Sequence, residues 1–183
     1  MKVFGIDPGS ARTGYGCVES DGSRHRLVAC GAIGIRASHP FPEKLRIIHL
    51  ELGALIAQHH PDCVAIENLF HAVNVKTALI LGHARGVAML AAVEAGVPIF
   101  EYTPAEVKQS VVGYGRAEKR QVQSMIQLLL GLAAPTATFD ASDALAVAIC
   151  HLHKMNLRGV AGAVLRPGKA AARTTSWRAF RLR

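Results

Sequence analysis

The chain has 183 residues, of which 50% are hydrophobic and 19% are charged. These proportions suit one globular domain with a sizeable core and exclude an intrinsically disordered chain. No leader peptide is expected, because the N-terminus runs straight into a strand pattern with no long apolar stretch after Lys2. No membrane span is expected either, because Glu94 and Pro98 interrupt the apolar stretch over residues 86–100.

The net charge of +8 arises at the C-terminal end of the chain. Beyond Asp143 lie eight of the 21 Lys and Arg residues and none of the 13 acids. We therefore expect a domain over residues 1–156, followed by a basic, mobile C-terminal tail over residues 157–183. This charge distribution favours a polyanionic partner such as a nucleic acid, although a tail that only aids solubility would carry the same charges.

Three strands joined by tight turns are predicted at the start of the chain. Residues 2–7 form the first strand, and Pro8-Gly9-Ser10 ends it as a turn. Residues 14–20 and 26–35 form the second and third strands, and Asp21-Gly22 between them is a hairpin signal. The three strands are expected to form an antiparallel meander.

Helices then alternate with short buried strands. Apolar residues at helical spacing predict an amphipathic helix over residues 43–59, and residues 62–67 follow as a buried strand. Residues 75–95 form a helix rich in small residues, with Gly96 as its C-cap, and residues 97–102 form the next strand. The small residues predict close packing of this helix against the sheet, a second copy of the chain, or both.

The rest of the domain is predicted to be helical. Thr103, Pro104 and Glu106 make a capping-box start for one helix. After a glycine-containing loop over residues 113–117, two further helices are expected over residues 118–130 and from Asp140 to Met155. The element order predicts an α/β fold: a mixed five-stranded sheet, with three antiparallel strands before helix-linked parallel strands, flanked by helices.

Four carboxylates are the candidate functional residues. Asp7 and Glu67 end predicted strands inside apolar runs, and Asp140 and Asp143 lie three residues apart at the start of the last helix. If these acids converge, their mutual repulsion requires a compensating cation, and oxygen ligands suit Mg²⁺ or Mn²⁺. Two such ions, about 3.5–4 Å apart, can support displacement at a phosphodiester.

Each acid taken singly also has an ordinary structural interpretation. Asp7 precedes a Pro-Gly turn, and Glu67 could be a surface charge at a strand end. Asp140 could simply cap a helix, with Asp143 complementing the helix dipole. The metal-site hypothesis is favoured because one fold brings all four acids toward one place.

Several motifs carry a resemblance to a known family. Phe4-Gly5-Ile6-Asp7-Pro8-Gly9 followed by Thr13-Gly14-Tyr15-Gly16 resembles the first strand of the RuvC resolvases, which have a ribonuclease H-like fold. The same string also resembles the phosphate loop of actin-like and sugar-kinase ATPases. Four further segments favour the RuvC family: residues 65–70, 81–86, 102–119 and 140–146. The resemblance covers about residues 1–155 and leaves the basic tail outside it.

The resemblance implies a set of site residues. The metal ligands would be the four acids, Asp7, Glu67, Asp140 and Asp143, holding two Mg²⁺ ions for which Mn²⁺ can substitute. Residues near the DNA would be Lys108 and Lys119 close to the scissile backbone and Phe70 stacking on or between bases, with Arg116 and Tyr114 as weaker candidates from the loop. Ordinary solvated lysines and a core phenylalanine are the competing interpretations.

The resemblance also implies an activity and partners. Such a protein is a cytoplasmic homodimeric endonuclease that resolves four-way (Holliday) DNA junctions during homologous recombination and DNA repair. It makes two symmetric metal-dependent nicks and leaves 5′-phosphate and 3′-hydroxyl ends. It works with the RuvA–RuvB branch-migration complex, and no membrane is involved. An isologous dimer suits this task because its two-fold axis matches that of the junction.

Three other functions remain open from the sequence. An actin-like or sugar-kinase-type phosphotransferase fits the loop after Asp7, but that class closes two domains over a nucleotide and this chain is short for two domains. A non-catalytic junction-binding module would need only the basic tail and the small-residue helix. Ribonuclease H activity shares the expected fold and metals, and the 102–119 segment favours junction cleavage over it.

Overall fold

The computed structural model describes residues 1–68 and 74–164, with side chains described as far as residue 156. Its strands are β1 (Lys2–Asp7), β2 (Arg12–Ser20), β3 (His25–Gly34), β4 (Cys63–Glu67) and β5 (Ile99–Tyr102). They form a single five-stranded sheet in the order β3-β2-β1-β4-β5. β1, β2 and β3 pair antiparallel, whereas β4 pairs parallel with both β1 and β5. The predicted mixed sheet is therefore confirmed.

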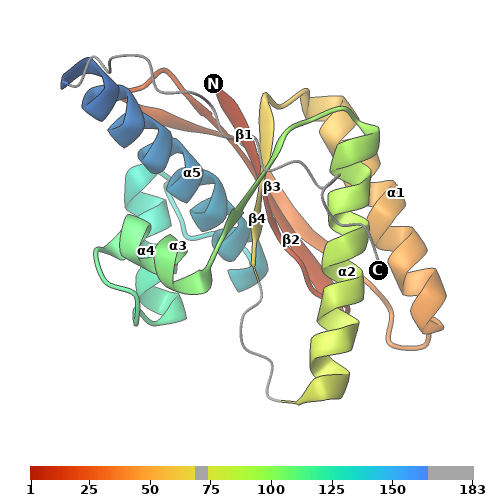
Figure 1. The fold of residues 1–183 in the computed structure, drawn as a ribbon. Helices are drawn as coiled ribbons and strands as arrows, with labels where there is room; N and C mark the ends of the chain where they lie inside the picture. Colours follow the sequence, from red (N-terminus) through yellow and green to blue (C-terminus); the bar gives the residue numbers. More distant parts are fainter. Residues whose placement is uncertain (69–73, 165–183) are drawn as a thin grey trace, which may run out of the picture.

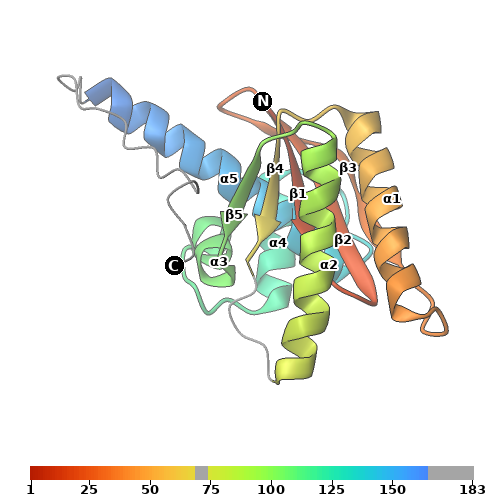
Figure 2. The same cartoon turned by 45° about the vertical axis from the view of Figure 1, so that its right-hand side comes forward.

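Helices cover both faces of the sheet (Figure 1). They are α1 (Phe41–His59), α2 (Val75–Glu94), α3 (Pro104–Val112), α4 (Lys119–Leu129) and α5 (Phe139–Val164). α1 and α2 pack on one face of the sheet. α3, α4 and α5 pack on the other face and are called the α5 layer below; both views show this arrangement (Figures 1 and 2). The fold has three layers, with a hydrophobic core on each side of the sheet.

The alternation of side chains along β1 decides which residues meet which layer. Phe4 and Ile6 are fully buried in the core beneath α1 and α2, whereas Val3 is buried in the core beneath α5. Successive side chains in a strand point to opposite faces, so Asp7 falls on the same side as Val3. The end of β1 thus presents a carboxylate to the α5 layer.

The start of α3 matches the expected capping box. The Thr103 backbone N–H donates to Oε2 of Glu106 at 2.8 Å, and the Glu106 N–H donates to Oγ1 of Thr103 at 3.3 Å. Pro104 occupies the first turn, where its missing N–H leaves no carbonyl unsatisfied. A local sequence pattern therefore determines where the chain turns from β5 into the helix beside the candidate site.

Most element ends agree with the prediction to within two residues, as at Arg12, where β2 begins, and Phe41, where α1 begins. β5 begins at Ile99 rather than Val97, because the Val97 N–H donates to the Ala92 carbonyl of the preceding helix and Pro98 has no N–H. α5 continues to Val164 rather than ending near Met155. The first proline after position 155 is Pro167, so no residue that lacks an N–H interrupts the backbone ladder before Val164. The far end of α5 extends beyond the sheet (Figure 2).

α2 is the one helix among the described residues that is long and apolar enough, by length and composition alone, to span a membrane. A single such helix is weak evidence for a membrane. One side of α2, containing Ala84, Ala88 and Ala91, is buried where α2 packs against α1 and the sheet. The small residues predicted to allow close packing of this helix therefore do so within the domain.

Candidate active site

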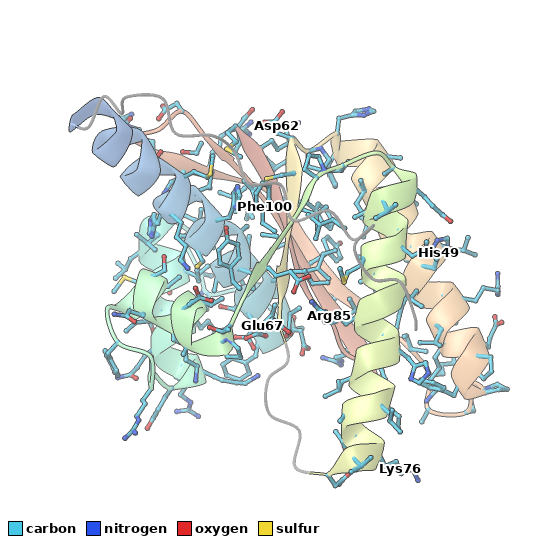
Figure 3. All side chains as sticks on the ribbon, in the orientation of Figure 1. His49, Asp62, Glu67, Lys76, Arg85 and Phe100 are labelled. Atoms are coloured by element: carbon cyan, nitrogen blue, oxygen red, sulfur yellow. The ribbon has the colours of Figure 1, made fainter. Side chains whose placement is uncertain are left out.

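A pocket of about 220 Å³ opens at the carboxyl ends of the two central parallel strands, β1 and β4. Figure 3 shows Glu67 at the end of β4 that faces α3, opposite Asp62 at the other end. The pocket is lined by Asp7, Glu67, Pro104, Val107, Lys108, Lys119, Val122, Asp143 and Ala146. It combines acidic, basic and apolar side chains from both central strands and from all three helices of the α5 layer.

The register of the sheet places Asp7 beside Glu67. Ile6 pairs with Ile66 across the parallel β1–β4 ladder, and each acid is the next residue of its strand. Ala65 is buried in the α5-side core, so Glu67, two residues later, points to that side as well. Two carboxylates from separate parts of the chain therefore meet at one edge of the sheet.

Burial raises the pKa of both carboxylates in this pair. It raises the pKa of Asp7 from 3.8 to about 6, and the charge of Asp143 adds to the rise. Burial also raises the pKa of Glu67 from 4.5 to about 8, and the charge of Asp7 adds to that rise. A hydrogen bond between the two groups lowers the pKa of Asp7 and raises that of Glu67, so Glu67 is the proton donor.

Asp143 faces this pair from the first turns of α5 and is ion-paired. Nζ of Lys119, the first residue of α4, donates to Oδ2 of Asp143 at 2.9 Å. The hydrogen bond to Asp143 raises the pKa of Lys119, with further help from the charge of Asp7. The charged ammonium group of Lys119 therefore lies at the pocket and binds the carboxylate of Asp143, a predicted metal ligand.

Asp140 lies one helical turn before Asp143 and does not line the pocket. Its Oδ2 lies 3.7 Å from Nη1 of Arg12, at the start of β2. Asp140 is still close enough for its charge to raise the pKa of Asp7. The structure thus brings Asp7, Glu67 and Asp143 together in one pocket and places Asp140 beside it.

The donor chemistry of the site fits a hard divalent cation. Three carboxylates share the pocket, and protonation of Glu67 relieves the same repulsion that a cation would relieve. Across the part of the chain with described side chains, no three His, Cys, Asp or Glu residues are already spaced to hold a metal ion. Two of the four acids are engaged in ion pairs instead, Asp143 with Lys119 and Asp140 with Arg12.

The predicted DNA-contacting residues fall into three groups. Lys108 and Lys119 both line the pocket. Arg116 and Tyr114 lie exposed in the loop between α3 and α4 outside the pocket lining, and the Tyr114 hydroxyl donates to Gln121 at 2.7 Å. Phe70 lies outside the described residues.

Sequence reasoning missed two residues that shape the surroundings of Asp7. Arg12 is the ion-pair partner of Asp140. Thr13 is fully buried, and its hydroxyl donates to the Gly9 carbonyl at 2.8 Å, which closes the loop that follows Asp7. The available signal was their place at the end of the Pro8-Gly9 turn, but a turn signal does not say what its side chains will contact.

The strand order, with helices on both faces of the sheet, is that of the ribonuclease H-like class, and in this chain carboxylates meet at the ends of β1 and β4 and on the facing helix. The family model described as crossover junction endodeoxyribonuclease RuvC matches residues 3–151. The chain belongs to this RuvC family.

Individual relatives agree with the family match. A crossover junction endodeoxyribonuclease RuvC from Trichlorobacter lovleyi is 50% identical over 181 residues, and the alignment covers 99% of each chain. The protein of the same name from Pelobacter propionicus is 52% identical over 182 residues, again 99% of each chain. The likeness therefore extends across nearly the whole length of both relatives.

Solved structures confirm the predicted ribonuclease H-like α/β fold. Thermus thermophilus RuvC in complex with a Holliday junction substrate matches with a TM-score of 0.82 at 33% identity, covering 86% of this chain and 96% of that one. The yeast mitochondrial Holliday junction resolvase Ydc2 matches with a TM-score of 0.60 at 13% identity, covering 86% and 82%. The second likeness shows the shared fold alone.

Proposed function

We propose that this chain cuts four-way DNA junctions by two symmetric, metal-dependent nicks, during homologous recombination and DNA repair. Membership of the RuvC family supports the endonuclease activity. The observation that carries the chemical proposal is the meeting of Asp7, Glu67 and Asp143 in one pocket, with Asp140 one turn away. This cluster of acids is placed in a cleft that is also lined by two lysines.

The four carboxylates would hold two Mg²⁺ ions, and Mn²⁺, which shares the preference for oxygen ligands, would substitute. When bound, such ions activate water and stabilise the leaving 3′-oxygen, which gives 5′-phosphate and 3′-hydroxyl ends. Asp7 and Glu67, both half-buried, would provide the strand half of the ligand set. Asp143 and Asp140 would join it when they leave their ion pairs with Lys119 and Arg12.

The two pocket lysines would orient the DNA backbone. Lys108 projects from α3 and Lys119 from the start of α4, so their charges come from two sides of the loop over residues 113–118. If Asp143 bound a cation instead of Lys119, the Lys119 ammonium would be free to contact a phosphate. Arg116 and Tyr114 are exposed and would contact DNA beyond the cut site. A contact from Phe70 remains part of the same proposal.

A homodimer would place two such pockets on one junction. α2 leaves a strip of large apolar side chains in solvent, formed by Val75, Leu79, Leu90 and Val93. A shallow groove of about 500 Å³ on the same helix is floored by its small residues, including Gly82 and Gly86. A self-complementary apolar strip of this kind fits an isologous two-fold interface.

The cellular setting follows from the family and the chemistry. We expect the protein to act in the cytoplasm on junctions processed by the RuvA–RuvB complex. The four cysteines, Cys17, Cys30, Cys63 and Cys150, are all free, which fits a reducing compartment.

A denaturing-gel assay on a synthetic four-way junction tests the proposal. With each strand labelled in turn and Mg²⁺ present, we expect paired nicks in two strands of like polarity, with ends that a ligase can seal. Glu67→Gln should bind the junction but not cut it, which would also separate catalysis from mere junction binding. Equal cutting of linear duplex or of an RNA–DNA hybrid, or full activity of Glu67→Gln, would contradict the proposal.

A further inference from the structure

The start of α5 lies directly on the backbone of the sheet. A Cβ atom built on Gly14 in β2 would come within 2.1 Å of the backbone oxygen of Asp140, the second residue of α5. A Cβ atom on Gly5 in β1 would come within 2.0 Å of the Ala144 oxygen, one turn further along the helix. Real Cβ atoms essentially never approach other atoms closer than 3.0 Å, so only glycine allows this contact.

Space, rather than backbone conformation, requires glycine at position 14. The glycines with positive φ among the described residues are Gly22, Gly96, Gly113 and Gly131. Gly14 has an ordinary strand conformation, which any residue can adopt. The effect of adding a methyl group there can therefore be attributed to the close approach of α5.

Gly14 also lies at a particular place in the sheet. It is the cross-strand partner of Asp7 in the antiparallel β1–β2 ladder. Gly14 thus pairs with the strand that carries Asp7. It also contacts the helical turn that carries Asp140, and Asp143 lies one turn further along the same helix. This contact therefore lies between the two halves of the acidic site.

We propose that Gly14 is a positioning residue for the acidic site, which lets the first turn of α5 approach Asp7 closely enough for both to bind the same metal ions. This inference rests on the proposed metal role of the carboxylates. A methyl group at position 14 must increase the Cβ-to-Asp140 oxygen separation from 2.1 Å to at least 3.0 Å. The first turn of α5 would lift away from the sheet, carrying Asp140 and Asp143 away from Asp7.

The fold should tolerate this change at position 14. Phe139 is exposed, Asp140 is half-buried, and the loop before them is largely exposed, so the start of the turn can move at the cost of disturbing only the small buried side chains of Ala141 and Ser142. Gly5 differs, because the turn above it contains Ala144 and Ala148, which are fully buried. Gly5→Ala should therefore lower the melting temperature much more than Gly14→Ala.

Binding of Mn²⁺, followed by electron paramagnetic resonance on the full-length protein without DNA, tests the inference. We expect Gly14→Ala to weaken Mn²⁺ binding about 10- to 100-fold, the range for loss of a residue that supports metal ligands. Junction binding in EDTA should stay within about twofold of wild type, because phosphate contacts do not need the metal ligands. Gly34→Ala in β3 is the matched control, because a Cβ atom there meets nothing within 4 Å.

The outcomes separate this inference from the proposed function. If wild-type protein binds Mn²⁺ no better than Asp7→Asn, the metal role of the carboxylates fails. If wild type binds Mn²⁺ and a folded Gly14→Ala protein binds it equally well, the positioning role of Gly14 is wrong. If Gly14→Ala is less stable than wild type, the rise in Tm on adding saturating Mn²⁺ is compared between the two proteins. A rise in Gly14→Ala as large as that in wild type again overturns the inference.

Discussion

Nζ of Lys119 lies 2.9 Å from Oδ2 of Asp143, so a fixed positive charge engages a carboxylate that we assign to metal binding. The two groups come from different helices, α4 and α5, and meet over the pair formed by Asp7 and Glu67. A cation that enters the pocket must compete with this ammonium group for Asp143. Under the proposed function, the ion pair would couple metal binding to the release of a lysine that contacts DNA.

Lys119→Met should separate metal binding from cleavage. Without DNA, the variant should bind Mn²⁺ about two- to fivefold more tightly, because a competing positive charge is gone. Its nicking rate on a four-way junction should fall about 100-fold, because the phosphate loses its contact. Titration calorimetry and single-turnover cleavage measure the two effects. Lys108→Met is the control for metal affinity, since no ion pair joins Lys108 to a carboxylate within the described residues. An unchanged Mn²⁺ affinity of Lys119→Met would contradict the competition between Lys119 and the metal for Asp143.

Asp7→Asn should make the metal-free protein more stable at pH 8. The pKa of Asp7 rises from 3.8 to about 6 on folding and that of Glu67 from 4.5 to about 8, so the folded state binds protons more tightly. Stability from these groups is therefore fully present below about pH 4 and is lost as the pH rises to about 8. The amide never ionises, so we expect a gain on the order of 2 kcal/mol at pH 8, or about 4–8 °C in Tm.

Thermal melts of wild type and Asp7→Asn in EDTA at pH 5 and pH 8 check this prediction. The difference in Tm should be large at pH 8 and small at pH 5, and Mg²⁺ should raise the Tm of wild type more than that of the variant. A variant less stable than wild type at pH 8 would show that the buried carboxylate is not strained in the metal-free state.

A charge on the exposed strip of α2 should disrupt the proposed homodimer. The side chains of Leu79 and Leu90 are 58% and 48% exposed in the single chain. Leu79→Glu should leave the fold intact and shift the protein to a monomer that no longer makes paired nicks, because a buried unpaired carboxylate opposes association. Analytical ultracentrifugation measures the shift. Leu128→Glu in α4, at a side chain that is 75% exposed, is the matched control and should stay dimeric.

Removal of one buried hydroxyl should lower stability without affecting the site. The Tyr102 hydroxyl lies 2.7 Å from Nδ1 of the fully buried His151, which also contacts the Cys63 thiol at 3.4 Å. Tyr102→Phe should cost about 1–3 kcal/mol in the free energy of unfolding, because it removes a buried hydrogen bond. Tyr114→Phe removes the hydroxyl of an exposed side chain and should cost less than about 0.5 kcal/mol. Urea denaturation compares the two variants, and equal losses would contradict the difference in burial.

Lys108→Ala should weaken metal-free junction binding similarly for all sequences. Loss of one phosphate contact should reduce the slope of log K against log[salt] by about 1. Electrophoretic mobility shifts at several salt concentrations measure this slope. Arg46→Ala, which removes a side chain paired with Glu43 on the outer surface of α1, should leave the slope unchanged; an unchanged slope for Lys108→Ala would remove Lys108 from the DNA interface.

Local patterns in the sequence were enough to predict the order of the elements and most of their limits. The capping box at Thr103 and Glu106 formed as expected, because both partners lie within one helical turn. The alternation in β1 and the apolar period of α1 also depend on residues close in the chain. The motifs around Asp7, Glu67 and Asp143 identified the family for the same reason, since each is a short contiguous string.

Only the tertiary structure decided how the carboxylates relate to one another. The proton shared by Asp7 and Glu67, the engagement of Asp143 by Lys119, and the place of Asp140 beside Arg12 all join residues distant in the chain. The contact of Gly14 with the backbone of Asp140 was equally invisible, because a glycine in a strand does not reveal what passes above it. Sequence periodicity determines which face a side chain takes, whereas packing of the layers determines the separation, burial and charge on which the chemistry depends.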